Sequence, residues 1–226
     1  MNPMHTATAQ KKGFTLVEIL IAVGLMGVVV TGILSFVFQA MRVYVYDSGR
    51  LMVNRDMRTF TGSLSADAVA SNYFRIYPSF QNRTTPVTDG VSGDFLVLVF
   101  TDTNTSTGVY CITQLVGYYR APADTSNPTS LGPVRRFDTG APGTANAITT
   151  ADQSMSLPDL LTKYAATSTS ATNPIVIQLA QGLSNGTLFY DYRDRSVMVR
   201  GQIVDYGSQG GRAAISTYNY TVSPRG

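Results

Sequence analysis

The first part of the chain is one continuous apolar run. Residues 14–38 read FTLVEILIAVGLMGVVVTGILSFVF, and Glu18 is the only ionisable side chain among them. As a helix, this run spans about 37 Å at 1.5 Å per residue, enough to cross a hydrocarbon core of about 30 Å with some tilt. We therefore predict a membrane-spanning helix over residues 14–38.

The helical pattern continues past the apolar run in amphipathic form. Apolar residues recur in steps of four, three, four and four, along one face of a helix: Val53, Met57, Phe60, Leu64 and Ala68. No proline interrupts residues 4–77. The sequence predicts one long helix over about residues 14–72, in which residues 39–72 form an amphipathic continuation that packs its apolar stripe on a globular domain.

Beyond residue 73 the pattern changes to short strands separated by polar loops. Apolar, β-branched and aromatic residues concentrate in segments 94–100, 109–120, 134–137, 174–179, 187–192, 196–204 and 213–222. The second and third of these segments are expected to form a hairpin. Residues 138–173 are rich in Ala, Thr, Ser, Gly and Pro, which predicts a long surface excursion with a short helix near Leu157–Ala165. We expect residues 73–226 to form a β-rich domain.

These patterns together predict the fold class. The chain is expected to be α+β, with a long N-terminal helix packed on a C-terminal antiparallel sheet. The first half of the helix is predicted to span a membrane and the second half to contact the sheet.

Composition narrows the chemistry that is open to the chain. Lys and Arg total 17 and Asp and Glu 14; without residues 1–13, which hold Lys11 and Lys12, the difference falls to 15 − 14 = +1. That balance does not indicate nucleic-acid binding. Cys111 is the only cysteine, which excludes an intramolecular disulfide and a cysteine-based zinc site. His5 is the only histidine and precedes the apolar run, so Ser-His-Asp and Cys-His catalysis are excluded once a leader is removed. We predict a protein that is not an enzyme and has no cofactor.

Two groups of polar residues bear on metal binding. Asp102, Asn104 and Ser106 alternate as in the first half of an EF-hand loop, but no bidentate glutamate follows them. A polar hairpin loop is therefore the favoured interpretation. Three aspartates flank a predicted strand, namely Asp191, Asp194 and Asp205, and aspartates in such places usually serve turn geometry. We predict no metal site.

Glu18 is the only glutamate of the chain. A carboxylate at bilayer depth costs on the order of 3 kcal/mol or more, so such a residue is by default a functional site with a partner. The alternative without a function is that Glu18 extends toward the nearby interface. An ordinary secretory signal would have an apolar core of only about 7–15 residues and a small-residue cleavage site, neither of which is found here.

Residues 11–18 read Lys-Lys-Gly-Phe-Thr-Leu-Val-Glu, which closely resembles the type IV prepilin cleavage motif. In that family a prepilin peptidase cuts after the glycine and methylates the new N-terminus. The resemblance implies that residues 1–13 are a leader peptide, that cleavage separates Gly13 from Phe14, and that Phe14 becomes N-methylated. It also places Glu18 at the position of the family's glutamate.

The resemblance supplies a partner for Glu18. After cleavage the amine of Phe14 is a positive charge at the end of an apolar helix, and Glu18 of one subunit is expected to pair with the Phe14 amine of a neighbour. The basic residues Lys11 and Lys12 keep the N-terminal side in the cytoplasm, so residues after Arg42 are expected in the periplasm, beyond the inner membrane. The implied partners are the prepilin peptidase, other pilin or pseudopilin subunits, the inner-membrane assembly platform and membrane lipid.

The order of elements also resembles the J-type minor pseudopilins of type II secretion and the related W/J-type minor pilins. The residues that carry this resemblance are Arg55-Asp56-Met57-Arg58, the segments 115–120 and 132–137, and Leu183 with the segment 188–192. The resemblance implies a minor subunit of a type IV pilus or secretion pseudopilus. The alternative from another class is a single-pass membrane protein with an extracytoplasmic binding or hydrolytic domain, which would keep residues 1–13.

Overall fold

The computed structural model describes residues 13–103, 108–122, 127, 130–165, 172–182, 187–205 and 214–225, with backbone only at 179, 205 and 214. The chain divides into two compact units, Met1–Val45 and Tyr46–Gly226. Helix α1, Leu16–Ala70, contributes to both units. Its bounds agree to within two residues with the helix that the sequence predicts, and the two units are described separately below.

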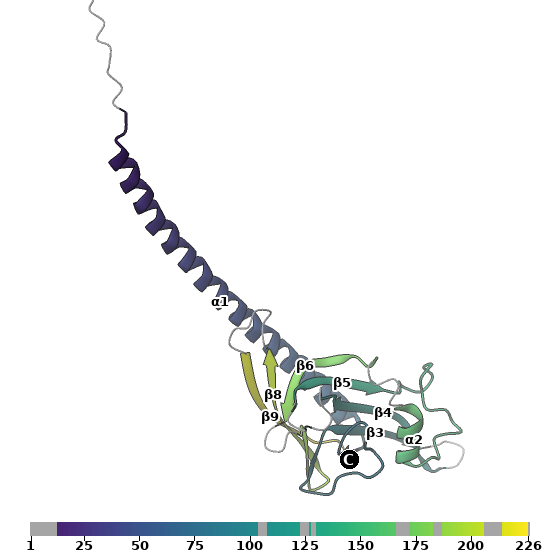
Figure 1. Cartoon of the computed structure of the whole chain (residues 1–226). Coiled ribbons are helices and arrows are strands. Elements are labelled where there is room, and N and C mark those ends of the chain that lie inside the picture. The colour runs from purple at the N-terminus through teal and green to yellow at the C-terminus, as the bar shows by residue number, and fades with distance from the viewer. Residues whose placement is uncertain are drawn as a thin grey trace, which may run out of the picture. The chain divides into compact units, whose positions relative to one another are not determined.

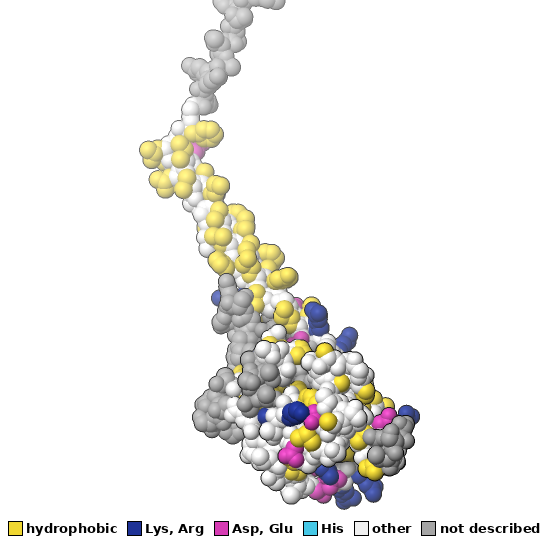
Figure 2. All heavy atoms as spheres, turned by 90° about the vertical axis from the view of Figure 1, so that its right-hand side faces the viewer, with side chains coloured by type: hydrophobic (Ala, Val, Ile, Leu, Met, Phe, Trp, Pro, Cys, Tyr) yellow, Lys and Arg dark blue, Asp and Glu magenta, His cyan; other side chains and the backbone are white. Residues whose placement is uncertain are grey.

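The first unit is, in its described part, the apolar portion of α1. All described residues from Gly13 to Tyr44 are exposed, and Figure 2 shows hydrophobic side chains along this portion of the helix. The most apolar 18-residue window of α1 has a mean hydropathy of 2.5 and no buried residue. By length and composition α1 can therefore cross a membrane, as the apolar run predicts.

The second unit is built on one antiparallel sheet (Figure 1). Its strands are β1 (Tyr73–Tyr77), β2 (Ser92–Gly93), β3 (Phe95–Thr103), β4 (Tyr110–Arg120), β5 (Gly132–Asp138), β6 (Ile175–Gly182), β7 (Phe189–Tyr192), β8 (Ser196–Asp205) and β9 (Ala214–Val222). The strand order is β1-β3-β4-β5-β6-β8-β7-β2, and β9 pairs with β8. Helix α2, Leu157–Tyr164, lies between β5 and β6 in the sequence. The α+β prediction and the predicted β4–β5 hairpin are confirmed.

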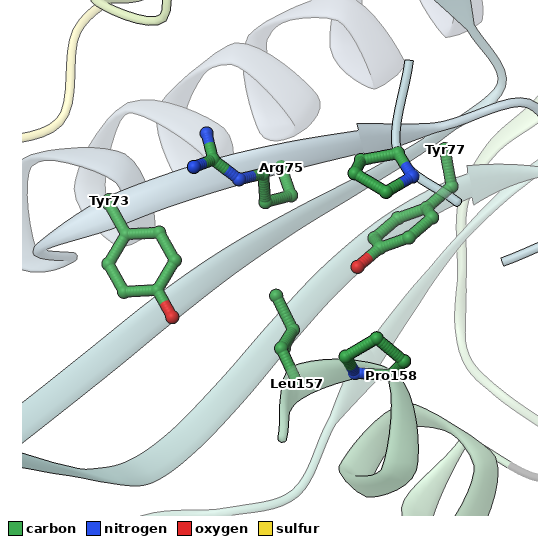
Figure 3. A pocket seen from close by; sticks show the side chains of 6 residues that line it. Tyr73, Arg75, Tyr77, Leu157 and Pro158 are labelled. Carbon is green, nitrogen blue, oxygen red and sulfur yellow. The ribbon is translucent and has the colours of Figure 1, made fainter. Parts of the chain in front are cut away.

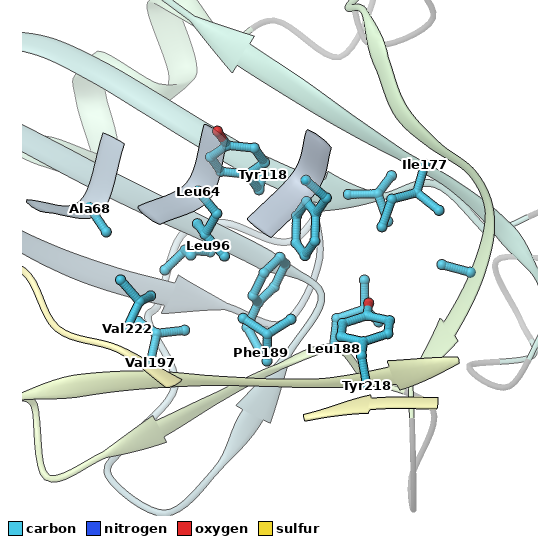
Figure 4. Packing of buried hydrophobic residues seen from close by; sticks show 14 of the residues in the cluster. Leu64, Ala68, Leu96, Tyr118, Ile177, Leu188, Phe189, Val197, Tyr218 and Val222 are labelled. Atoms are coloured by element: carbon cyan, nitrogen blue, oxygen red, sulfur yellow. The ribbon is translucent and has the colours of Figure 1, made fainter. Parts of the chain in front are cut away.

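The amphipathic part of α1 packs on one face of the sheet. Four residues of the predicted stripe are buried, namely Val53, Phe60, Leu64 and Ala68, and Met57 lies partly buried beside them. They share a core with strand residues that include Leu96 and Tyr118 (Figure 4). Since burying one large apolar side chain contributes about 1.5–3 kcal/mol, this stripe is enough to hold the second half of α1 on the sheet.

The other face of the sheet carries a second core. Successive residues of a strand point to opposite faces, and in β3 the side chains of Phe95, Val97 and Val99 belong to this second cluster. Ile148 and Leu160, which precede and lie within α2, are buried against it. The segment after β5 is exposed along much of its described length, as the predicted surface excursion requires. Its buried side chains have a role that was not predicted, because they cover this face of the sheet. The short helix itself is confirmed.

A buried ion pair lies at the junction of three strands of the second unit. Arg120 Nη2 lies 2.5 Å from Asp94 Oδ2, and the two side chains are 0% and 8% exposed. Asp94 Oδ1 also accepts a hydrogen bond from the backbone N–H of Leu188 at 3.0 Å. Burial raises the pKa of Asp94, and the bonds from Arg120 and Leu188 oppose that shift. The pair fixes the start of β3, the end of β4 and the approach to β7 to one another.

Candidate functional site

The predicted cleavage site lies just before the first turn of α1. Gly13 and Phe14 are not helical, and Phe14 is 84% exposed. A Cβ atom placed on Gly13 would have no neighbour within 4 Å. The peptide bond between these residues therefore lies outside the helix and is exposed. The predicted leader residues Lys11 and Lys12 lie outside the described residues.

Thr15 and Glu18 form a reciprocal cap on the helix N-terminus. The backbone N–H and the hydroxyl of Thr15 donate to Glu18 Oε2 at 2.9 Å and 3.0 Å. In return, the backbone N–H of Glu18 donates to Thr15 Oγ1 at 3.3 Å. The carbonyl of Thr15 accepts the first helical bond, from Ile19. This is a capping box, which satisfies donors that the first turn of a helix otherwise leaves unpaired.

The capping box gives Glu18 a partner that the sequence prediction missed. The signal was present, because Thr15-Leu-Val-Glu18 has the spacing of a capping box directly before an apolar run. Both bonds from Thr15 reach Oε2, and no donor among the described residues reaches Oε1. The helix dipole favours a carboxylate at this end. Glu18 is therefore held in place while one of its oxygens remains available for another donor.

Small residues lie along one face of the apolar part of α1. Gly24, Gly27, Thr31, Gly32 and Ser35 line a shallow groove together with Val28. Their spacing of three and four residues places them on the same side of the helix. A face of this kind lets another backbone approach closely.

The aspartates near the end of β7 serve turn geometry, as predicted. The backbone N–H of Asp194 donates to Asp191 Oδ1 at 2.9 Å, and Arg193 and Asp194 have φ of 57° and 52°. The Asp194 carboxylate also pairs with Arg75 at 3.0 Å. These contacts account for both carboxylates at the β7–β8 turn. The side chain of Asp205 lies outside the described residues.

Only part of the segment with EF-hand-like spacing lies within the described residues. Asn104 and Ser106 lie outside the described residues, while the side chain of Asp102 accepts a bond from the backbone N–H of Thr103 at 2.7 Å. Within the ranges that the structure describes, no group of three or more His, Cys, Asp or Glu residues is placed to hold a metal ion.

A shallow pocket of about 400 Å³ lies between β1 and the start of α2 (Figure 3). It is lined by Tyr73, Arg75, Tyr77, Pro86, Leu157 and Pro158. Burial raises the pKa of Tyr77 to about 12 and raises that of Tyr73 as well, so both phenols stay neutral near pH 7. The lining therefore offers apolar contacts and an already paired guanidinium rather than a catalytic acid and base.

Comparison with known proteins bears on the N-terminal site. Residues 8–34 match the family described as the prokaryotic N-terminal methylation motif. The chain carries a type IV prepilin-like signal peptide. This match confirms the resemblance to the type IV prepilin motif and supports a structural rather than a catalytic protein, while the resemblance to J- and W-type minor subunits stays a prediction. No curated protein and no solved structure matches the chain. The type IV pilin-like segment includes Gly13, Phe14, Thr15 and Glu18, whose individual roles remain predictions.

Proposed function

We propose that this pilin-like chain is a structural subunit, and a minor one, of a type IV pilus or type II secretion pseudopilus. The observation that carries the proposal is a methylation motif placed on an exposed apolar helix whose first turn is capped by Glu18. Prepilin peptidase removes residues 1–13 and methylates Phe14. The subunit then leaves the inner membrane and enters a filament through its helix.

The geometry before α1 supports cleavage between Gly13 and Phe14. Proteolysis requires a backbone that the enzyme can enclose, and helical structure would prevent this. Both residues precede the helix and are exposed, while the capping box starts the helix at the next position. The protein thus presents the bond for cleavage without unwinding the membrane-spanning segment.

Cleavage creates the charge that Glu18 needs in the assembly. The new amine of Phe14 and the Glu18 carboxylate are each costly to leave unpaired away from water. Thr15 occupies one oxygen of Glu18, and a neighbour's Phe14 amine pairs with the other. Because a buried ion pair contributes more to register than to net stability, this contact aligns an incoming subunit along the filament axis. The groove of small residues between Gly24 and Ser35 lets neighbouring helices approach closely.

Glu18→Leu tests the charge pair. The variant should insert and be processed normally, but its incorporation into filaments should fall about tenfold or more, the factor that about 1.4 kcal/mol of lost pairing produces. Gln39→Leu is the matched control, since it also replaces a polar residue of α1 by leucine but removes no charge. Quantifying each variant in sheared filaments measures the effect. Incorporation of Glu18→Leu at the level of Gln39→Leu would refute the pairing.

A further inference from the structure

Strand β9 is paired on one side only. Its register with β8 runs from Val197↔Val222 to Asp205↔Ala214, and no other strand in the described part of the chain pairs with it. Figure 1 shows β9 beside β8. The second edge of β9 therefore carries backbone groups that no described strand uses.

The hydrogen bonds of β8 decide which residues these are. The N–H of Arg200 donates to the carbonyl of Leu188, on the β7 side of β8, so the even residues of β8 direct their backbone groups away from β9. The odd residues of β8 therefore bond to β9, and the register makes their partners the even residues of β9. The remaining residues of β9 direct their N–H and C=O groups outward: Ile215, Thr217, Asn219 and Thr221. Their side chains are also exposed.

This edge lacks the usual protection against pairing. In natural proteins, charges, prolines, bulges or short length keep edge strands from pairing with strands of other chains. Residues 214–222 contain no charge and no proline, and their pairing with β8 has no bulge. The strands at the two ends of the sheet order, β1 and β2, are each approached by another part of the chain: Val87 N donates to Ile76 O of β1, and a Cβ on Gly93 of β2 would lie 2.2 Å from Tyr77 O.

We propose that β9 is a docking edge for a β-strand of a different protein subunit, which extends the sheet by strand addition. This inference rests on the proposed function, because it identifies a contact that the β-rich domain makes in the assembly. Only another extended backbone can pair four outward N–H groups and four outward C=O groups in alternation. Opposite Thr217 and Asn219, the partner strand carries uncharged β-branched or hydroxyl side chains.

A second copy of the chain does not fit this edge in antiparallel pairing. Antiparallel pairing of β9 with itself requires a two-fold axis normal to the sheet, which reverses any direction that lies along the sheet. Residues from Val53 to Ala68 of α1 pack along the sheet face, so they would run in the opposite direction in the second copy. The subunits of the proposed filament share one direction along its axis instead.

Amide hydrogen exchange of the processed full chain tests the docking edge residue by residue. In detergent, the amides of Thr217 and Asn219 should exchange about tenfold or more faster than those of Tyr218 and Tyr220. In sheared filaments, the amides of Thr217 and Asn219 should slow by about 100-fold. Fast exchange of these two amides in filaments would overturn the proposal, as would slow exchange already in detergent.

Proline substitution distinguishes the contribution of the backbone N–H groups of this edge to assembly from the contribution of its side chains. Thr217→Pro with Asn219→Pro removes two outward N–H groups that β8 does not use, whereas Thr217→Val with Asn219→Val keeps both. The proline pair should enter filaments about tenfold less than the valine pair. Equal incorporation of the two pairs would overturn the docking edge. In the same assay, a loss with Glu18→Leu but not with the proline pair refutes only the edge, and the reverse result refutes only the charge pair.

Discussion

At the scale of single residues, Glu18 combines two kinds of partner. Within its own chain it caps the helix through Thr15, and in the proposed assembly it meets the amine of another subunit. The position of Glu18 in an apolar run was enough to single it out from the sequence. The role of Thr15 as a partner of Glu18 was not predicted. A charged group was expected to pair with an opposite charge, whereas the nearest donors to Glu18 are the neutral N–H and hydroxyl of Thr15. Its Thr-x-x-Glu spacing could have revealed it.

Thr15→Val removes the hydroxyl of the cap and leaves a side chain of nearly the same shape. Losing a capping residue costs about 1 kcal/mol, so the first turn of α1 should open about fivefold more often. Hydrogen exchange of the amides of Glu18 and Ile19, which both donate to Thr15, reports this opening when it is measured for the full chain in detergent. Thr15→Ser is the control and should behave like the original chain. Equal protection in the valine variant would show that the capping box contributes nothing.

At the scale of elements, a polar clasp joins the end of α1 to the sheet. Asp67 Oδ2 accepts hydrogen bonds from the Tyr118 hydroxyl at 2.5 Å and from Arg136 Nε at 3.0 Å. Arg136 also pairs with Asp138 at 2.8 Å. Burial and the nearby Asp67 raise the pKa of Tyr118, so its hydroxyl remains a donor. The clasp fixes the rotation of α1 about its axis, which the apolar stripe alone leaves less defined.

Asp67→Ala should lower the free energy of unfolding by about 1–3 kcal/mol, because it leaves two partly buried donors without their acceptor. Arg75→Ala is the matched control. It breaks an exposed pair, with Asp194, in which the side chains are 44% and 63% exposed, and should cost at most about 1 kcal/mol. Denaturant unfolding of both full-length variants in detergent measures the difference. Equal losses would mean that the clasp is no stronger than a surface ion pair.

Some elements could be predicted from the sequence and others could not. Long periodic segments such as α1 and the apolar strand β3 were found because their patterns extend over many residues. β1 and β2 were missed: β1 is only five residues long and contains Arg75, and β2 has two residues, so tertiary pairing rather than local pattern defines them. The packing of residues 138–165 on the sheet could not be predicted from their own pattern either, because the strands that they cover come from other parts of the sequence.

At the scale of the whole molecule, the second unit buries several tyrosines in its two cores. Burial raises the pKa of Tyr77 to about 12, and it also raises the pKa values of Tyr118 and Tyr218. The folded state therefore disfavours tyrosinate, while an unfolded tyrosine ionises near pH 10. The stability that neutral tyrosine provides is complete below about pH 10 and is lost as the pH rises from there through the folded pKa.

Stability of the full chain should accordingly fall between about pH 10 and 12, by at most about 1.4 kcal/mol per pH unit for each buried tyrosine. Tyr77→Phe should make this decline shallower, because one ionisation that favours unfolding is removed. Denaturant midpoints measured across this pH range test the effect. A decline of the same steepness in the variant would show that Tyr77 does not contribute to it.

The proposed assembly depends on the conversion of a precursor into a subunit with a new N-terminus. The direct measurement is mass spectrometry of the N-terminal peptide of the chain, extracted from the membranes of cells with active prepilin peptidase. We predict a peptide that begins at N-methylated Phe14, with residues 1–13 absent. An intact peptide that begins at Met1 would contradict the account.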